Sequence, residues 1–268
     1  MTREDRPWEG VGETSCDRVV TFPVSADDLV IRRNEVHVWR AHLEPPTDSV
    51  GVLRSSLDPD ELARADRFVF ERHRLRYVAA HGFLRHVLGG YLSVSAEAIQ
   101  FGRARHGKPF LASHAARSLG PALRFNLAHS RDRALIAVSL DREVGIDLED
   151  VCRDRDVLGL TRRYFSPSEA AALQALPVHE WTSAFYRCWT RKEAYVKACG
   201  TGLAMRLDSF DVSFEPGVPP ALLRSERGSN EPRLWQFVEP VAGAGFAAAL
   251  AVEGDSWRMV TYALEFPD

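Results

Sequence analysis

The segment W-T-R-K-E-A-Y-V-K-A-C-G-T-G-L, from Trp189 to Leu203, contains the end of a predicted helix that runs from Glu180 to Cys199 and is closed by Gly200. Glu193 and Lys197 stand four residues apart, so both side chains reach the same side of that helix. A surface ion pair and an anion-binding site explain this spacing equally well. The apolar residues recur at three- and four-residue spacing and predict one buried stripe: Trp181, Phe185, Cys188, Trp189, Val196 and Cys199.

An acidic strand is predicted upstream of this helix, in V-G-I-D-L-E-D at residues 144–150. Apolar residues alternate there with Asp147 and Glu149, so both carboxylates project from one face of the strand. Two carboxylates that close repel each other, and Mg²⁺, which prefers oxygen ligands, would relieve the repulsion. A half-buried strand with a solvated acidic face accounts for the same alternation.

The remaining elements mix helices with short strands in two successive halves, which predicts an α+β fold and argues against a doubly wound parallel sheet. We expect one or two helices between Asp58 and Leu92, and a helix after the capping box that begins at Ser166. Strands are predicted near residues 35–43, 97–111, 124–129, 134–140, 209–214, 234–238, 245–252 and 257–264. The predicted division is 1–34, a poorly ordered or loosely packed extension, then 35–142 and 143–268.

Composition sets limits on the partners and the compartment. With 26% charged residues and a net charge of -3, no bulk attraction to nucleic acid or to a membrane is expected. The first residues, MTREDRPWEG, lack the pattern of a signal peptide, and no apolar run is long enough to span a membrane. The four cysteines show no metal-binding spacing, which is typical of reduced thiols in a cytoplasmic protein.

Lysine is rare in this chain. Of its 34 basic residues only three are lysines, Lys108, Lys192 and Lys197. A lysine that persists among so many arginines is a pointer to a position that needs a compact ammonium group.

Several further residues are candidates for binding an anion or for acid–base chemistry. His129 and Ser130 directly follow a strand and could cradle a phosphate, although a histidine at a strand end is more often structural. Glu169 occupies the third position of its capping box and needs no other role. Lys108 lies in the turn G-K-P, which alone is uninformative.

Taken in order, these fragments closely resemble the Sfp-type 4′-phosphopantetheinyl transferase family. G-I-D-L-E followed by W-x-x-K-E-A-Y-x-K-A-x-G-x-G-L is the specific part, and the similarity extends from about Leu57 to Phe210. The resemblance implies two similar α+β halves related by a pseudo-twofold, with coenzyme A in the cleft between them. It also implies transfer of the phosphopantetheine arm of coenzyme A to a serine of an acyl or peptidyl carrier protein, with release of adenosine 3′,5′-bisphosphate.

The resemblance also implies roles for individual residues. Asp147, Glu149 and Glu193 resemble the magnesium ligands, and Glu193, or failing that Glu169, is the expected base for the carrier serine. The residues expected to bind coenzyme A are Lys108, His129, Ser130 and Lys197 at its phosphates, with Arg76 and Arg64 at the 3′-phosphate end. Lys197 is grouped with the catalytic residues as well. Ala128 departs from the family pattern, which often has a hydroxyl residue there.

Two other functions fit the acidic residues and the lysines. One is a magnesium-dependent hydrolase of nucleotides or other pyrophosphates, which would use water in place of the serine. The other is a noncatalytic module that binds coenzyme A or a carrier protein. We expect the protein to be a monomer. Which pathway is served, of fatty acid, polyketide or nonribosomal peptide synthesis, is not legible in the sequence.

Overall fold

A computed structural model describes residues 18–25, 29–112, 122–152 and 154–266. The chain divides into two compact units, and we treat each by itself. Unit 1 comprises Ala104–Lys108 and Arg142–Ser256, together with Met1–Thr14, which lie outside the described residues. Unit 2 comprises Ser15–Arg103, Pro109–Asp141 and Trp257–Asp268. Residues 1–17, which include Cys16 and the first half of the predicted extension 1–34, lie outside the described residues.

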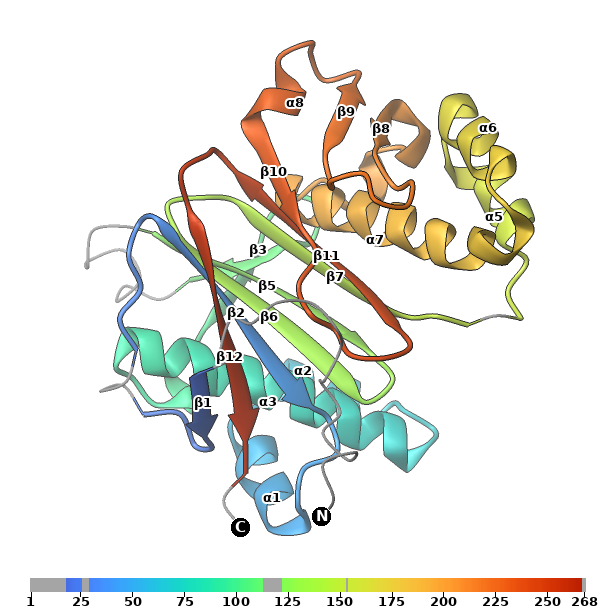
Figure 1. The fold of residues 1–268 in the computed structure, drawn as a ribbon. Helices are drawn as coiled ribbons and strands as arrows, with labels where there is room; N and C mark the ends of the chain where they lie inside the picture. The colour runs from blue at the N-terminus through green and yellow to red at the C-terminus, as the bar shows by residue number, and fades with distance from the viewer. Residues whose placement is uncertain (1–17, 26–28, 113–121, 153, 267–268) are drawn as a thin grey trace. The chain divides into compact units, whose positions relative to one another are not determined.

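Unit 2 is built on a five-stranded sheet with the order β1-β12-β2-β6-β5 (Figure 1). The strands β1, β12 and β2 run parallel to one another, and β6 is antiparallel to both β2 and β5. The strands of the unit are β1 (Arg18–Thr21), β2 (Glu35–His42), β3 (Phe101–Arg103), β4 (Pro109–Leu111), β5 (Leu123–Ser130), β6 (Arg133–Leu140) and β12 (Arg258–Glu265). Its helices are α1 (Thr47–Ser55), α2 (Pro59–Ala65), α3 (Glu71–Leu92) and the short η3 (Ala96–Ala98).

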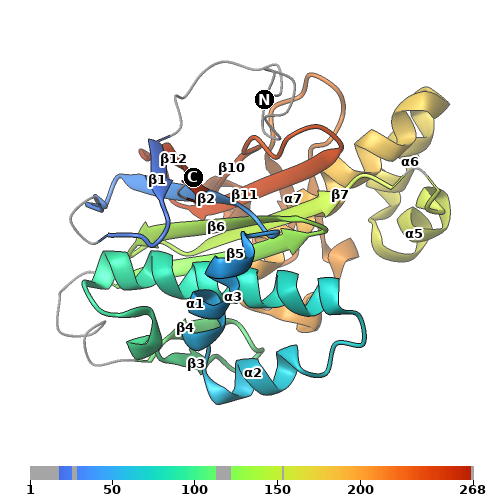
Figure 2. The same ribbon diagram turned by 90° about the horizontal axis from the view of Figure 1, so that it is seen from below.

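The core of unit 2 forms where α3 crosses one face of this sheet (Figure 2). Phe83, Val87 and Leu88 of α3 are fully buried and belong to the same apolar cluster as Trp39 of β2 and Ile136 of β6. Apolar burial of this kind is the main favourable contribution to folding. The buried side chains of α3 therefore fix the helix against one face of the sheet.

Unit 1 contains a three-stranded antiparallel sheet, β10-β11-β7, and a separate hairpin of β8 and β9 (Figure 1). Its strands are β7 (Val144–Asp150), β8 (Phe210–Val212), β9 (Leu222–Ser225), β10 (Trp235–Val238) and β11 (Phe246–Glu253). Its helices are α5 (Val157–Tyr164), α6 (Pro167–Ala175), α7 (Trp181–Cys199), α8 (Glu231–Leu234) and the short η4 (Val178–Glu180), η5 (Gly202–Ala204) and η6 (Leu207–Ser209).

The long helix α7 packs directly on β7. A Cβ atom added at Gly145 of β7 would lie 2.1 Å from the carbonyl oxygen of Ala194 and 2.3 Å from the backbone nitrogen of Ala198. Real side-chain atoms do not approach a backbone that closely, so only glycine allows this contact. The predicted stripe of α7 is confirmed, because all six of its residues belong to the apolar cluster of unit 1 or pack against it.

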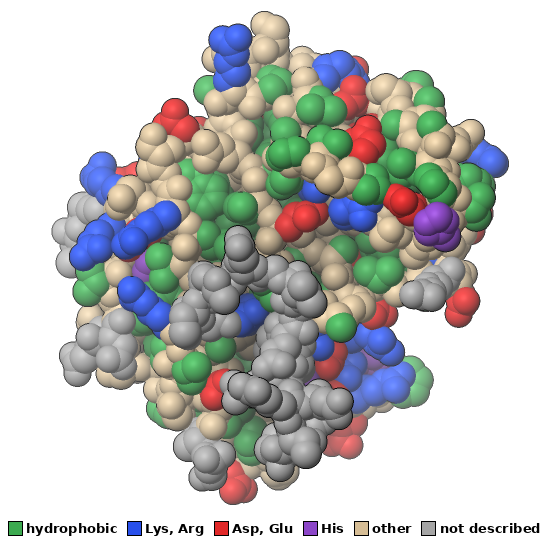
Figure 3. Space-filling view, viewed as in Figure 1, with side chains coloured by type: hydrophobic (Ala, Val, Ile, Leu, Met, Phe, Trp, Pro, Cys, Tyr) green, Lys and Arg blue, Asp and Glu red, His purple; other side chains and the backbone are tan. Residues whose placement is uncertain are grey.

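The mixed α+β prediction is confirmed, with differences in detail. The structure adds α1, α5, α8, β1 and β9, which the sequence analysis had not assigned. The predicted grouping placed residues 257–264 with 143–256, whereas β12 pairs with β1 and β2 in unit 2. No helix among the described residues is long and apolar enough to cross a membrane. Acidic and basic side chains are interspersed on the face shown in Figure 3, in keeping with the small net charge.

Candidate active site

The candidate site begins with the face of β7 that meets α7. Side chains alternate along a strand, so Gly145, Asp147 and Glu149 share the face on which the backbone of α7 packs. Opposite them on β11 stand Ala251, Ala249 and Ala247. The residues paired with this face of β7 therefore carry only methyl side chains.

Asp147 is 5% exposed and has one oxygen that is paired and one that is not. Its Oδ1 accepts a hydrogen bond of 2.6 Å from Nζ of Lys197 on α7. Its Oδ2 is buried and has no hydrogen-bond partner among the described residues. Leaving a buried carboxylate oxygen unpaired costs free energy, so the arrangement favours a ligand at that oxygen.

Glu149 and Glu193 both respond electrostatically to Asp147. Burial and the charge of Asp147 raise the pKa of Glu149 to about 7, although Arg155, Lys197 and a hydrogen bond from Trp189 oppose the shift. Burial, then Asp147, also raises the pKa of Glu193, against the opposing effect of Lys197. Three carboxylates whose charges disfavour one another are typical of a site that binds a cation.

The carboxylates do not form a preassembled metal site. Among the residues that the structure describes, no three His, Cys, Asp or Glu side chains are grouped closely enough to hold a metal ion. The donor set still suits magnesium, which takes carboxylate oxygens and is completed by substrate phosphates and water. Asp147 Oδ2 is the carboxylate oxygen whose hydrogen-bonding capacity is unfilled among the described residues.

Lys197 is the cation of the site. Its Nζ donates to Asp147 and to the carbonyl oxygen of Ile146 at 3.2 Å, and 30% of its side chain is exposed. Within the described part of the chain these are its two hydrogen bonds, so a third N–H donor stays available for a ligand. The position fits the predicted contact with a phosphate.

Lys108 lies differently from its prediction. Its Nζ donates to Oε2 of Glu143 at 2.7 Å, to the carbonyl of Ala198 at 2.8 Å and to the carbonyl of Val144 at 3.2 Å. An ammonium group has three N–H donors, and all three have an acceptor here. Contact with a phosphate would require one of these bonds to break.

Glu169 is 3% exposed and is held on every side. One oxygen accepts from the backbone N–H of Val212 at 2.9 Å, and the other contacts Nζ of Lys192 at 2.7 Å and the N–H of Ser166 at 3.0 Å. Lys192 is itself fully buried and also donates to the carbonyls of Leu207 and Phe210. A role as general base would require Glu169 to leave this buried pair.

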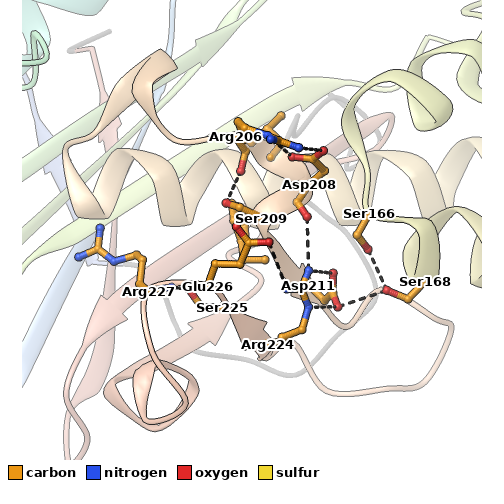
Figure 4. Close-up of polar contacts among 12 residues, drawn as sticks. Ser166, Ser168, Arg206, Asp208, Ser209, Asp211, Arg224, Ser225, Glu226 and Arg227 are labelled. Atoms are coloured by element: carbon orange, nitrogen blue, oxygen red, sulfur yellow. Dashed lines mark hydrogen bonds and ion pairs between the residues drawn. The ribbon is translucent and has the colours of Figure 1, made fainter.

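Polar side chains at the start of α6 contact the hairpin of β8 and β9 (Figure 4). Ser166 and Ser168 are hydrogen-bonded to each other, and Ser168 also contacts Oδ2 of Asp211 on β8 at 3.2 Å. Arg224 of β9 donates to both oxygens of Asp211. The N-terminus of α6 is therefore anchored to the hairpin of β8 and β9.

His129 and Ser130 lie at the end of β5 in unit 2. His129 is exposed and Ser130 is half-buried, and both make contacts with other groups. Because neighbouring residues of a strand point to opposite faces, His129 shares its face with the core residues Phe125 and Leu127, and Ser130 does not. A single cradle formed by both side chains is therefore not what the strand geometry favours.

Arg64 and Arg76 also belong to unit 2. Arg64 lines an open hollow of about 600 Å³, together with Asp60, Ala63, Arg67 and Phe68. Two guanidinium groups beside an aromatic ring make this hollow suitable for an anion. Arg76 is bound to Oε1 of Glu44 at 2.5 Å, and its buried Nε has no partner among the described residues.

Two family models and several known proteins match this chain. Residues 143–251 match the model of the 4′-phosphopantetheinyl transferase superfamily, and residues 41–141 match the model of a 4′-phosphopantetheinyl transferase N-terminal region. The 4′-phosphopantetheinyl transferase HetI of a Nostoc species is 39% identical over 231 residues, which cover 86% of this chain and 93% of HetI. The chain belongs to the 4′-phosphopantetheinyl transferase family.

Other relatives are less similar and match a smaller share of this chain. The 4′-phosphopantetheinyl transferase of Bacillus subtilis is 28% identical, over 60% of this chain and 67% of its own. The solved holo-[acyl-carrier-protein] synthase of Thermotoga maritima is 25% identical and covers 42% of this chain and 63% of its own, with a TM-score of 0.33. The family assignment rests on the similarity to HetI and not on the Thermotoga maritima structure.

Sequence reasoning missed several residues that shape the site of this transferase. Gly145 permits the close packing of α7, and its position two residues before Asp147 on the same face was the available signal. The alternating alanines of β11 were a second signal. The influence of Arg155 and Trp189 on Glu149 had no signal in the sequence, because it depends on tertiary contacts.

Proposed function

We propose that this transferase moves 4′-phosphopantetheine from coenzyme A to a serine hydroxyl of an apo acyl or peptidyl carrier protein, with magnesium, and releases adenosine 3′,5′-bisphosphate. One observation carries the proposal. Asp147 keeps an unpaired buried oxygen while its charge raises the pKa values of Glu149 and Glu193, with Lys197 alongside. That combination supports binding of a cation and of a pyrophosphate at the same place.

In the proposed complex, Asp147, Glu149 and Glu193 would hold the magnesium ion. When bound there, the ion would neutralise negative charge on the pyrophosphate of coenzyme A. Lys197 would use its remaining N–H donor to bind a phosphate oxygen. Phosphoryl transfer depends mainly on positioning and on charge stabilisation, and these residues would supply both.

The bond changes in the proposed reaction balance without a further reactant. The serine oxygen bonds to the phosphorus that carries the pantetheine arm, and the bond from that phosphorus to the bridging pyrophosphate oxygen breaks. The electron pair of the broken bond leaves with adenosine 3′,5′-bisphosphate. Glu193 takes the serine proton, in keeping with its raised pKa and its place beside Asp147.

Residues of unit 2 complete the proposal. His129 and Ser130 would contact phosphate oxygens separately, since they lie on opposite faces of β5, and Arg64 and Arg76 would contact the 3′-phosphate. The hollow beside Arg64 supports the last of these roles. The arrangement of two related halves with coenzyme A between them, which the family resemblance implies, is part of the same proposal.

The test is intact-mass spectrometry of an apo carrier protein incubated with this chain, coenzyme A and magnesium. The expected result is a gain of one phosphopantetheine mass per carrier, which a serine-to-alanine carrier should not show. A chelator should remove the gain if the metal is required. Release of the bisphosphate without any carrier would instead identify a hydrolase and contradict the proposal.

A further inference from the structure

Lys108 has a role open to it other than binding a phosphate. Residues Ala104–Lys108 belong to unit 1, and the Lys108 side chain is 15% exposed. Its ammonium group donates to one carboxylate, that of Glu143, and to two main-chain carbonyls, those of Val144 and Ala198. A buried ammonium with three oxygen acceptors has its hydrogen-bonding capacity filled from within the protein.

The acceptors lie at the ends of two elements. Val144 is the first residue of β7, and Glu143 directly precedes it. Ala198 lies in the last turn of α7, where main-chain carbonyls have no partner within the helix. A cation at this end also interacts favourably with the helix dipole. The ammonium of Lys108 therefore bonds the end of α7 to the beginning of β7.

The end of α7 is shaped to accept this side chain. Gly200 closes the helix with φ of +65°, and a Cβ atom there would lie 3.0 Å from Cδ of Lys108. Glycine thus serves both the left-handed turn and the passage of the lysine stem. Nearby, a Cβ atom on Gly202 would lie 3.1 Å from the carbonyl oxygen of His106.

We propose that Lys108 is a positioning residue that sets the spacing between the two elements of the active site. Asp147 lies three residues after Val144, and Lys197 is the residue before Ala198. A shift at the Lys108 bond would therefore move the carboxylates of β7 relative to Glu193 and Lys197. The inference rests on the proposed function and removes Lys108 from the residues that contact coenzyme A.

Lys192 supports this interpretation by analogy within the same unit. Its buried ammonium also joins one carboxylate, of Glu169, to two main-chain carbonyls, of Leu207 and Phe210. In a chain with 34 basic residues, lysine stands at these two positions. The planar guanidinium of arginine cannot direct three donors to acceptors placed around a tetrahedral nitrogen.

The test compares Lys108→Met and Lys108→Arg with Arg105→Met, which removes an exposed charge from the same turn. Coenzyme A affinity is measured by calorimetry without magnesium, and kcat by the mass assay at saturating substrate. We expect both Lys108 variants to lower kcat on the order of 10- to 100-fold, as a small misplacement does. Their Kd for coenzyme A should change less than about threefold, and Arg105→Met should match the wild type.

Two results would overturn the proposal. A Kd for coenzyme A that rises on the order of tenfold in Lys108→Met and recovers in Lys108→Arg would show a direct phosphate contact. An unchanged kcat in both variants would show that the bond does not position the site. Should Lys108→Met not fold, Glu143→Gln weakens the same bond without removing the ammonium and is expected to lower kcat in the same direction.

Hydrogen exchange separates this inference from the proposed function. The backbone amides of residues 196–200 should exchange faster in Lys108→Met than in Arg105→Met, whether or not the chain transfers phosphopantetheine. Failure of the wild type to modify any carrier would defeat the proposed function alone. Unchanged exchange at the end of α7 would defeat the positioning role alone.

Discussion

Two strand carboxylates, Glu35 in unit 2 and Glu149 in unit 1, meet opposite environments. In both cases burial alone favours a higher pKa. For Glu35, hydrogen bonds from Arg258, the backbone of Arg32 and His37 outweigh burial and lower the pKa to about 2. For Glu149, the neighbouring charge of Asp147 adds to burial, and the pKa rises to about 7.

The difference lies in what surrounds each carboxylate. Glu35 is surrounded by hydrogen-bond donors, which stabilise its charge and make it part of the framework of the β2–β12 pair. Glu149 and Asp147 face each other as like charges, and Asp147 retains an oxygen without a partner. A structural carboxylate has its hydrogen bonds supplied by the protein, whereas a carboxylate expected to bind a ligand keeps an oxygen that the protein does not bond.

The largest expected effect comes from the unpaired carboxylate. If the proposed function holds, Asp147→Asn and Glu193→Gln should each lower the rate of phosphopantetheine transfer on the order of 10²- to 10³-fold, because each removes a carboxylate that would hold the magnesium ion against the reacting phosphates. Circular dichroism should show that both variants remain folded. Glu35→Gln, the matched change in unit 2, should keep transfer within about twofold once folding is confirmed. Near-normal transfer by Asp147→Asn would contradict the contrast between a structural Glu35 and a ligand-binding Asp147.

The next effect tests the packing that brings α7 to the acidic face. Gly145→Ala should destabilise the protein by about 3 kcal/mol and lower transfer as well, because its methyl group meets the backbone of α7. Urea denaturation and the mass assay measure the two effects. Gly51→Ala in α1 is the control, since a Cβ atom there meets nothing within 4 Å. It should stabilise the chain by at most about 1 kcal/mol.

The pH dependence of stability tests the environment of Glu35 in unit 2, through its neighbour His37. Burial lowers the pKa of His37 from 6.5 to about 4, against the opposing effect of Glu35. The unfolded chain therefore binds a proton between pH 6.5 and 4 that the folded chain does not. His37 by itself should lower the free energy of unfolding by up to about 1.4 kcal/mol per pH unit as pH falls through this window, whereas the raised pKa values of Glu149 and Glu193 act in the opposite sense there.

Urea denaturation at several pH values measures that slope. In His37→Gln the slope between pH 6.5 and 4 should become smaller, even if the variant is less stable overall. Glu35 contributes in a lower window, since its stabilisation is present above pH 4.5 and is lost as pH falls toward 2. An identical slope in His37→Gln and the wild type would contradict the assignment.

The smallest expected effect concerns Lys197, the cation on the acidic face. Lys197→Ala should weaken the affinity for coenzyme A on the order of tenfold, because a charge-assisted hydrogen bond to phosphate is lost. Calorimetry gives the affinity directly, and Lys197→Arg should recover most of it. If Lys197→Ala binds coenzyme A as tightly as the wild type, Lys197 does not contact the phosphates and its role is confined to the bond with Asp147.

Local sequence patterns predicted much of this molecule. The alternation in residues 144–150 placed Asp147 and Glu149 on one face of a strand, and the spacing of Glu193 and Lys197 placed both on one side of a helix. That these two elements meet came from the family resemblance and not from the local pattern, and in the structure Lys197 bonds to Asp147. The capping box at Ser166 is present as predicted. These features depend on the period of a strand or a helix, and the sequence displays that period directly.

Other features depend on contacts distant in sequence. The three acceptors of Lys108 come from residues 143, 144 and 198, so its pairing has no local pattern. Strand β1 has only four residues and is stabilised by pairing with β12. Helix α1 follows Pro46, has no side-chain cap and contains Gly51, and its composition is typical of a loop. In α5 the signal was present, since Asp156 caps the helix through the N–H of Gly159.

The position of β12 has a consequence for how the chain is made. This strand, the last in the sequence, lies between β1 and β2 in their sheet. On the ribosome, residues 142–256 can emerge and collapse before it does, while the earlier strands wait for a missing neighbour. The sheet that begins with the earlier strands is therefore completed late, and the edges of β1 and β2 stay unpaired until β12 has been synthesised.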